Sequence, residues 1–199
     1  EYYSLYPNAS YGGKFSAWAA SPSRAPYNSF GNGSAMRASP IGFAFDSLEV
    51  VLDRAQESAA KTHNHPEGIK GAQATASAIF LARKGKTKEE IRQAIENLFG
   101  YSMDESIGSL RKHYQFDATC QGSVPQAITA FLESDHFEDA IRKAVSIGGD
   151  SDTIACIAGG IAHAYYKEIP DPIVDQVYRA LDSRLRRIVT LFCNKYSCH

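Results

Sequence analysis

Hydrophobic residues recur at helical spacing along most of this chain, and the alternation that marks a half-buried strand is nearly absent. Leu48, Val51 and Ala55, for example, stand at i, i+3 and i+7 and predict a helix over residues 47–62. A chain of 199 residues with 44% hydrophobic content can bury one sizeable core, and no repeat or linker divides it. The sequence therefore predicts one all-α domain over residues 1–199.

Other segments carry the same spacing together with start and stop signals. Thr87 and Glu90 form a capping-box pattern ahead of an apolar stripe, and Gly100 follows as a C-cap. Small residues dominate the segments 72–82 and 154–166, which allows neighbouring helices to approach closely there. Besides the helix over residues 47–62 and the one that begins after Thr87, the expected helices span residues 72–82, 125–132, 137–147, 154–166 and 173–192.

Two glycines, two carboxylates and a hydroxyl stand just before the helix expected at 154–166. Asp150, Asp152 and Thr153 offer only oxygen, which suits a hard cation such as Mg²⁺, Mn²⁺ or Ca²⁺. Gly148 and Gly149 allow a sharp turn that sets the acids at a helix N-terminus, where negative charge is favoured. The same residues also make a good N-cap, so by itself this segment fits a capped helix as well as a metal site.

A second loop, residues 26–37, is rich in glycine and short polar side chains. Gly31 and Gly33 allow the backbone to come close to a ligand, and Asn32 and Ser34 add polar groups. A helix that begins near Ser34 would point its free amides at this loop, where they could cradle phosphate. An ordinary Gly-Asn-Gly turn with Ser34 as N-cap is the alternative.

A third loop, Thr-His-Asn-His-Pro-Glu-Gly, begins at residue 62 and joins two helices. His63 and His65 could bind a metal, donate to phosphate or transfer protons. A purely structural role is the alternative, and i, i+2 spacing is poor for one face of a helix.

The motifs Phe-Gly-Asn-Gly-Ser-Ala-Met-Arg, Thr-His-Asn-His-Pro, Ser-Val-Pro-Gln-Ala-Ile and Gly-Gly-Asp-Ser-Asp-Thr-Ile-Ala follow one another in this order between about Tyr6 and about Tyr166. In these four motifs the chain resembles the ADP-ribosylglycohydrolase family, which includes the dinitrogenase reductase-activating glycohydrolase and hydrolases of ADP-ribosyl-arginine and ADP-ribosyl-serine. The resemblance implies a compact all-α domain of orthogonally packed helices with a binuclear Mg²⁺ or Mn²⁺ centre. It also implies hydrolysis of the glycosidic bond between ADP-ribose and a modified acceptor.

Matching positions carry the family's site residues onto this chain. The resemblance implies that Asp150, Asp152 and Thr153 are metal ligands. His65 has no assigned role, and His163 stands where the family usually has glycine, so packing near the site is expected to differ there. The residues implied to bind ADP-ribose are Phe30 on adenine, Met36 in the same wall, Asn32, Gly33 and Ser34 around the phosphates, and His63.

The chain also departs from the family pattern. The other half of the metal site, a Thr-Asp-Asp-Thr motif near the N-terminus, is missing, and so is an earlier Gly-Asp segment that often accompanies a catalytic Glu. Asp46, the first aspartate, already lies beyond the glycine-rich loop, and the loop at residues 7–11 carries no carboxylate. We therefore expect the catalytic base and the remaining ligands ahead of Glu1. A catalytically inactive ADP-ribose-binding or structural protein, of the kind the family supplies as lens crystallins, is the alternative.

Charge and cysteine content narrow the partners. A formal net charge of −1 argues against nucleic acid or a membrane surface bound by bulk electrostatics. The partner that the family resemblance implies is ADP-ribose or an ADP-ribosylated protein or small molecule. No apolar run approaches the roughly 20 residues of a membrane span, and four cysteines without CxxC spacing favour a reduced, cytoplasmic protein. Cys193, Cys198 and His199 could bind a soft metal, although no second ligand pair accompanies them.

Overall fold

Helices account for almost all of the regular structure in the computed structural model, which describes residues 1–198. Within those residues the only other pairing is an isolated bridge between Gly31 and Thr119, so the all-α prediction is confirmed. None of the described helices is long and apolar enough to cross a bilayer. In chain order the helices are α1 (Tyr2–Leu5), α2 (Gly13–Ala20), α3 (Gly33–Met36), α4 (Ser39–Ala44), α5 (Leu48–Ala60), α6 (Pro66–Arg83), α7 (Lys88–Phe99), α8 (Ile107–His113), α9 (Cys120–Leu132), α10 (Phe137–Ser146), α11 (Ser151–Tyr166), α12 (Asp171–Ala180) and α13 (Ser183–Tyr196).

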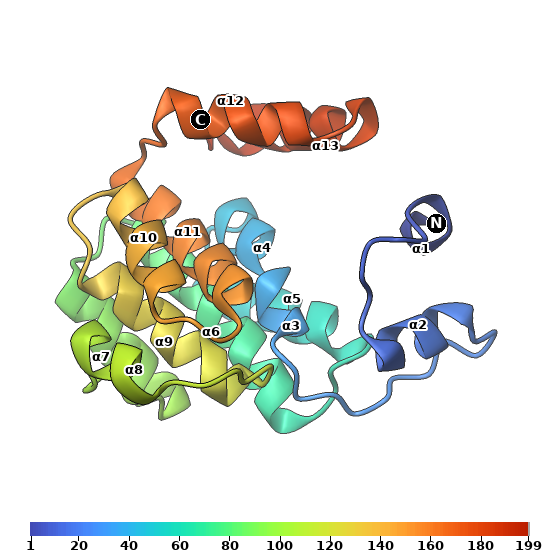
Figure 1. The fold of residues 1–199 in the computed structure, drawn as a ribbon, viewed down its shortest axis with the longest axis horizontal. Coiled ribbons are helices and arrows are strands. Elements are labelled where there is room, and N and C mark those ends of the chain that lie inside the picture. The colour runs from blue at the N-terminus through green and yellow to red at the C-terminus, as the bar shows by residue number, and fades with distance from the viewer. Residues whose placement is uncertain (199) are drawn as a thin grey trace.

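Helix α6 lies at the centre of the main body (Figure 1). Most of its buried residues are glycine or alanine, and Gly68, Gly71 and Ala72 are among them. Helices α3, α4, α5, α7, α9 and α11 all pack against it. Because the central helix is thin, the ends of its neighbours and the loops between them come close together.

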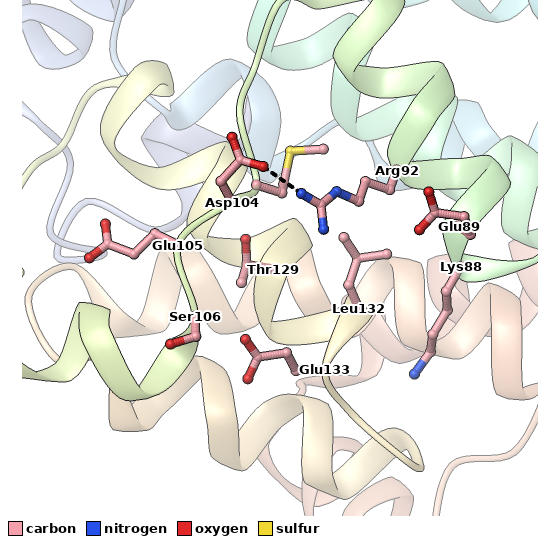
Figure 2. A pocket seen from close by; sticks show the side chains of 10 residues that line it. Lys88, Glu89, Arg92, Asp104, Glu105, Ser106, Thr129, Leu132 and Glu133 are labelled. Carbon is pink, nitrogen blue, oxygen red and sulfur yellow. Dashed lines mark hydrogen bonds and ion pairs between the residues drawn. The ribbon is translucent and has the colours of Figure 1, made fainter.

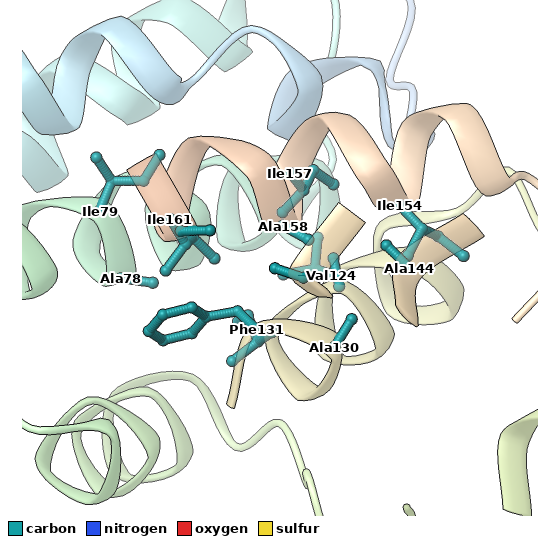
Figure 3. Packing of buried hydrophobic residues seen from close by; sticks show 14 of the residues in the cluster. Ala78, Ile79, Val124, Ala130, Phe131, Ala144, Ile154, Ile157, Ala158 and Ile161 are labelled. Atoms are coloured by element: carbon teal, nitrogen blue, oxygen red, sulfur yellow. The ribbon is translucent and has the colours of Figure 1, made fainter. Parts of the chain in front are cut away.

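Buried hydrophobic side chains of α9 and α11 fill the space beside α6 (Figure 3). Phe131 of α9 and Ile157 and Ile161 of α11 belong to this cluster, and all three are 0% exposed. Full burial of one such side chain contributes roughly 1.5–3 kcal/mol. This layer therefore fixes the position of α11, and with it the acidic segment that immediately precedes α11.

The strongest local signals in the sequence predict their helices well. Helices α5, α10 and α11 begin within a few residues of their expected starts. The capping box is confirmed, because the Thr87 hydroxyl accepts from the Glu90 amide at 3.2 Å and the Glu90 carboxylate accepts from the Thr87 amide at 2.8 Å. Gly100 ends α7 with a left-handed φ of 64°.

Helix α9 begins earlier than predicted. The sequence places its start at Pro125, a residue favoured in the first turn, but the helix starts at Cys120 and includes that proline. Thr119 is the actual cap, and its hydroxyl accepts from the Gly122 amide at 3.0 Å. The short helices α2, α4 and α8 were not predicted, because few buried apolar positions mark them.

The helix predicted over residues 173–192 is wrong as a single element, because α12 and α13 divide it. Leu181 adopts an extended conformation (φ −80°, ψ 138°). Asp182 then caps the new helix, its carboxylate accepting from the Leu185 amide at 2.9 Å. Neither helix has a fully buried residue, and the pair lies at one side of the body (Figure 1).

The four cysteines are free thiols in the described residues. The Cys198 amide donates to the Cys193 carbonyl at 3.3 Å, just after the end of α13. His199 lies outside the described residues, so the soft-metal alternative at this end of the chain stays an untested prediction.

The close packing around α6 leads to a prediction about two glycines. A Cβ atom at Gly71 would lie 2.6 Å from Cys120 Cβ, whereas one at Gly108 would meet nothing closer than Ser106 Oγ at 3.8 Å. We expect Gly71→Ala to lower the free energy of unfolding by about 1–3 kcal/mol through overpacking. Gly108→Ala, the matched control, should leave it unchanged or slightly raised. Equal urea midpoints for the two variants would contradict the close contact of α6 with α9.

Candidate functional site

Three loops that are far apart in the sequence meet at one end of the helical body. The glycine loop is held to the start of α9 by paired backbone hydrogen bonds: Asn32 N donates to Ala118 O at 2.8 Å, and Cys120 N donates to Phe30 O at 3.0 Å. We use three names below: glycine loop for residues 26–37, histidine loop for residues 62–68 and acidic loop for residues 146–153.

The histidine loop lies against the other side of the glycine loop. Asn28 N donates to Asn64 Oδ1 at 2.7 Å, and Ser29 N donates to Thr62 O at 3.4 Å. The glycine loop is therefore fixed from two directions although it is itself mostly irregular.

The acidic loop turns sharply into α11. Gly148 and Gly149 both have left-handed backbones, with φ of 84° and 59°, as the two-glycine pattern predicted. A side chain at Gly149 would also overlap the ring of Tyr114, at 2.5 Å from its nearest ring carbon. Asp150 stands at the N-cap position of α11, yet its side chain makes no capping hydrogen bond.

The Asp150 carboxylate is directed instead toward the glycine loop. The Asn32 side-chain amide donates to its Oδ2 at 2.6 Å, and the Thr153 hydroxyl donates to its Oδ1 at 3.2 Å. The same Asn32 amide donates to Ser123 Oγ on α9 at 2.8 Å. Burial raises the pKa of Asp150, the charge of Asp152 adds to the rise, and the Asn32 hydrogen bond opposes it. The capped-helix alternative therefore does not explain this side chain.

The oxygen atoms of the acidic loop fit one side of a hard-cation site. Asp150 and Thr153 are buried, and Asp152 is exposed beside them. Carboxylate and hydroxyl oxygens are ligands that Mg²⁺ and Mn²⁺ prefer, but such ions take about six of them. No group of three or more His, Cys, Asp or Glu side chains is placed to hold a metal among residues 1–198. The loop thus fits part of a coordination shell.

A pocket of about 540 Å³ opens beside the glycine loop. Four residues implied in ligand binding line it, namely Asn32, Gly33, Met36 and His63. Its lining includes two cationic side chains, Lys14 and Arg37, and no aspartate or glutamate. Three aromatic rings, Tyr11, Phe15 and Tyr27, complete much of the wall. A pocket with this lining suits an anion joined to a flat ring.

Phe30 and Ser34 lie outside the lining of this pocket. Phe30 is 46% exposed, and its ring packs against that of His65 at 5.3 Å between centroids. Ser34 is buried, and its hydroxyl donates to the Gly68 carbonyl at 2.7 Å. The Ser34 side chain thus joins α3 to α6 behind the pocket, and Asn32 rather than Ser34 stands at the N-cap position of α3.

The two histidines of the histidine loop have different roles. His65 caps α6, because its Nδ1 accepts from the Glu67 amide at 3.1 Å. His63 is buried in the pocket wall, and its Nδ1 lies 2.7 Å from Thr62 Oγ1. Burial, followed by the charge of Arg37, lowers the pKa of His63 to about 4, so its ring is neutral at pH 7.

His163 lies on α11 away from the acidic loop. Its ring packs against Phe43 of α4, with 5.3 Å between centroids. It stands about three helical turns along α11 from Asp152, and an effect on packing near the site stays a prediction.

Sequence reasoning assigned no role to several residues that build the site. Arg37 belongs to a quoted motif, and its guanidinium donates to Ser58 O at 2.9 Å and Thr62 Oγ1 at 2.9 Å. Ser123, in the Ser-Val-Pro motif, supplies the second acceptor for the amide of Asn32. Lys14 lines the pocket without any local motif to signal it, and Tyr27 lines it from the glycine loop, where no role was predicted for its ring.

A second pocket, of about 260 Å³, lies at the opposite end of α9 (Figure 2). Its charged groups are paired: Arg92 donates to Asp104 at 2.7 Å and to Glu96 at 3.0 Å, and Glu133 accepts from the Ile107 amide at 3.0 Å. These pairs join α7, α8 and α9, so this hollow is a structural junction.

Comparisons with known proteins show which proteins this chain resembles. A model of the ADP-ribosylglycohydrolase family matches residues 6–197. The chain is 31% identical to human ADP-ribosylhydrolase ARH3 over 195 residues, which covers 73% of this chain and 53% of that protein. It is 30% identical to ADP-ribosylarginine hydrolase Tri1 of Pseudomonas putida over 142 residues, which covers 68% of this chain and 38% of that protein.

A solved structure described as an ADP-ribosylglycohydrolase-related protein complex superimposes with a TM-score of 0.75 at 25% identity. It covers 99% of this chain, and this chain covers 71% of it. The chain spans about half the length of the ARH3 proteins it matches.

The low pKa of His63 makes stability depend on pH. Between its ordinary pKa of 6.5 and about 4, the unfolded chain binds a proton that the folded chain does not, so stability falls as pH drops through this window. Denaturant unfolding at pH 7 and pH 4.5 should show that the native protein loses roughly 2 kcal/mol more than His63→Gln does. Equal losses for both proteins would contradict a neutral buried His63.

The buried hydroxyl of Ser34 gives a second prediction. Ser34→Ala leaves the Gly68 carbonyl without its side-chain donor, so thermal unfolding should show a loss of about 1 kcal/mol. Ser29→Ala, at a partly buried pocket-lining hydroxyl, is the matched control and should cost less. A Ser34→Ala protein as stable as the native one would show that this hydroxyl does not join α3 to α6.

Proposed function

The chain belongs to the ADP-ribosylglycohydrolase family, and from this we propose that its pocket binds ADP-ribose and that the protein hydrolyses the glycosidic bond between ADP-ribose and a modified acceptor. One observation carries the proposal. Asn32 lines the pocket and donates to Asp150 at 2.6 Å, so a single side chain joins the ligand pocket to the acidic loop.

The lining of the pocket supports an ADP-ribose ligand. A diphosphate carries negative charge, and Lys14 and Arg37 are the cationic side chains of a lining that holds no carboxylate. His63 adds an uncharged polar group on the same wall. The exposed ring of Phe30, beside His65, is available to stack on a base.

We assign the oxygens of Asp150, Asp152 and Thr153 to one side of a centre that holds two Mg²⁺ or Mn²⁺ ions. The family as a whole is metal-dependent. When bound, such ions supply charge stabilisation and orient a hydroxyl group or a water molecule. The ligands that complete this centre are assigned outside the acidic loop, because three ligand residues do not fill the coordination shells of two ions.

The residues of the chain itself bind and orient the substrate. The remote contacts at the diphosphate and the base would fix the sugar and direct its anomeric carbon toward the acidic loop. Asp150 is held by Asn32 and Thr153 and is assigned a ligand role, so we do not assign it as general base. No residue of the pocket lining is assigned that role either, since none is a carboxylate.

We propose that the group to which ADP-ribose is attached is a protein side chain or a small molecule. A catalytically inactive protein that binds ADP-ribose is the second candidate, because the acidic loop supplies only two carboxylates and no group of three or more His, Cys, Asp or Glu side chains is placed to hold a metal among the described residues. We place the activity in the cytoplasm on the ground that all four cysteines are free.

Hydrolysis of defined substrates tests the proposal. The full-length protein should release ADP-ribose from ADP-ribosyl-arginine or ADP-ribosyl-serine peptides, and chelation of Mg²⁺ should abolish the release. Binding of ADP-ribose without release would identify the inactive binding protein instead. A protein that neither releases nor binds ADP-ribose would refute both candidates.

Asp152→Asn tests the metal ligand separately from catalysis. Asp152 is exposed at the first turn of α11, so this change should leave helical content intact. Mg²⁺ should raise the melting temperature of the native protein, because an ion that binds only the folded state stabilises it. The variant should show little of this rise. The same Mg²⁺-induced shift in both proteins would exclude Asp152 as a ligand.

A further inference from the structure

A buried threonine connects Arg37 to His63. The side chain of Thr62 is in the interior, at 2% exposure. Its Oγ1 accepts from the Arg37 guanidinium at 2.9 Å and lies 2.7 Å from Nδ1 of His63. The three side chains form a continuous chain from the end of α3 to the pocket wall.

The hydrogen-bond donors and acceptors of these three side chains decide which imidazole nitrogen carries the proton. A guanidinium only donates, so Thr62 Oγ1 is the acceptor in its bond with Arg37. The hydroxyl has one hydrogen, and at 2.7 Å Nδ1 of His63 is its nearest side-chain partner. The phenol of Tyr27 also interacts with Thr62 and can donate to its oxygen. All of these groups have partners when Arg37 and Tyr27 donate to Thr62 Oγ1 and Thr62 donates to Nδ1, which places the proton of the neutral ring on Nε2.

The other ring nitrogen faces the ligand pocket. Nε2 of His63 would lie 3.4 Å from a Cβ atom at Gly33 and 3.6 Å from one at Gly31. The two glycines therefore leave this nitrogen open toward the pocket, whose lining includes all three residues.

We propose that Arg37 and Thr62 are positioning residues that hold His63 as its neutral Nε2–H tautomer, so that the pocket presents a fixed, uncharged donor to an acceptor oxygen of the ligand. This inference rests on the proposed function for the identity of the ligand, but the tautomer itself does not depend on it. A phosphate or carbonyl oxygen of the ligand can accept a hydrogen bond from Nε2–H of His63. A ligand group that can only donate a hydrogen bond cannot.

The groups around His63 keep the ring uncharged. Arg37 is the cation that contacts Thr62 beside the imidazole. The ring of Tyr27 lies 6.0 Å from the imidazole of His63, measured between ring centroids. Burial and the Arg37 charge both lower the pKa of His63. Arg37 thus orients Thr62 and disfavours the imidazolium at the same time.

The first test needs no variant and no ligand. Nitrogen-15 NMR of the imidazole ring in the native protein at pH 7 distinguishes the two neutral tautomers by the shifts of their nitrogens. We expect a protonated Nε2 and an unprotonated Nδ1 for His63. A protonated Nδ1, or averaged shifts that indicate a mixture, would overturn the proposal.

Matched variants at residue 62 test the role of its hydroxyl. Thr62→Val removes the hydroxyl with nearly the same shape and should give His63 a mixture of tautomers, whereas Thr62→Ser keeps the hydroxyl and should keep the Nε2–H form. Circular dichroism melts establish that both variants are folded, and Arg37→Met, which removes the donor to Thr62, provides a second route if the valine variant is not. A native tautomer in folded Thr62→Val or in folded Arg37→Met would show that Arg37 and Thr62 do not set it.

Calorimetric titration with ADP-ribose then separates this inference from the proposed function. Loss of one oriented hydrogen bond should weaken ADP-ribose binding by about threefold to tenfold in Thr62→Val, with recovery in Thr62→Ser. Unaltered affinity in a Thr62→Val protein with mixed tautomers would refute the donor role of His63. A native protein that shows the Nε2–H tautomer but does not bind ADP-ribose would refute the proposed ligand and leave the positioning role of Arg37 and Thr62 intact.

Discussion

The side-chain amide of Asn32 donates at 2.6 Å to Asp150 and at 2.8 Å to Ser123, and the rest of the site depends on this pair of buried hydrogen bonds. It joins the glycine loop to the acidic loop across 118 positions of sequence. Because Asn32 also lines the pocket, a ligand held there touches the residue that orients the Asp150 carboxylate. In the proposed site, anion binding and cation binding therefore share one polar contact.

The fold makes this contact possible through the small residues of its central helices. Gly71 of α6 lies against Cys120 at the start of α9, and Gly160 of α11 lies against Ser39 of α4. Side chains at these positions would force the helices apart. Close packing of α6, α9 and α11 therefore brings three loop ends to one place, where backbone hydrogen bonds such as that from Asn32 to Ala118 hold them.

Much of the fold was predictable because its signals are local. The capping box at Thr87 and the paired glycines before Asp150 were read correctly, since neighbouring residues decide them. The role of each residue at the site was less predictable, because that role depends on contact partners far away in the sequence. Ser34 was expected at the ligand, yet its hydroxyl bonds to Gly68 of α6. No role was predicted for Arg37, although its guanidinium donates to Thr62, the residue beside His63.

The central claim is that the pocket and the acidic loop form one site joined by Asn32. Calorimetric titration of the full-length protein with ADP-ribose, with and without saturating Mg²⁺, tests it most directly, because coupling between two sites is reciprocal. We expect Mg²⁺ to change the affinity of the native protein for ADP-ribose and Asn32→Ala to remove this dependence. An affinity that is the same with and without Mg²⁺ in the native protein would contradict it.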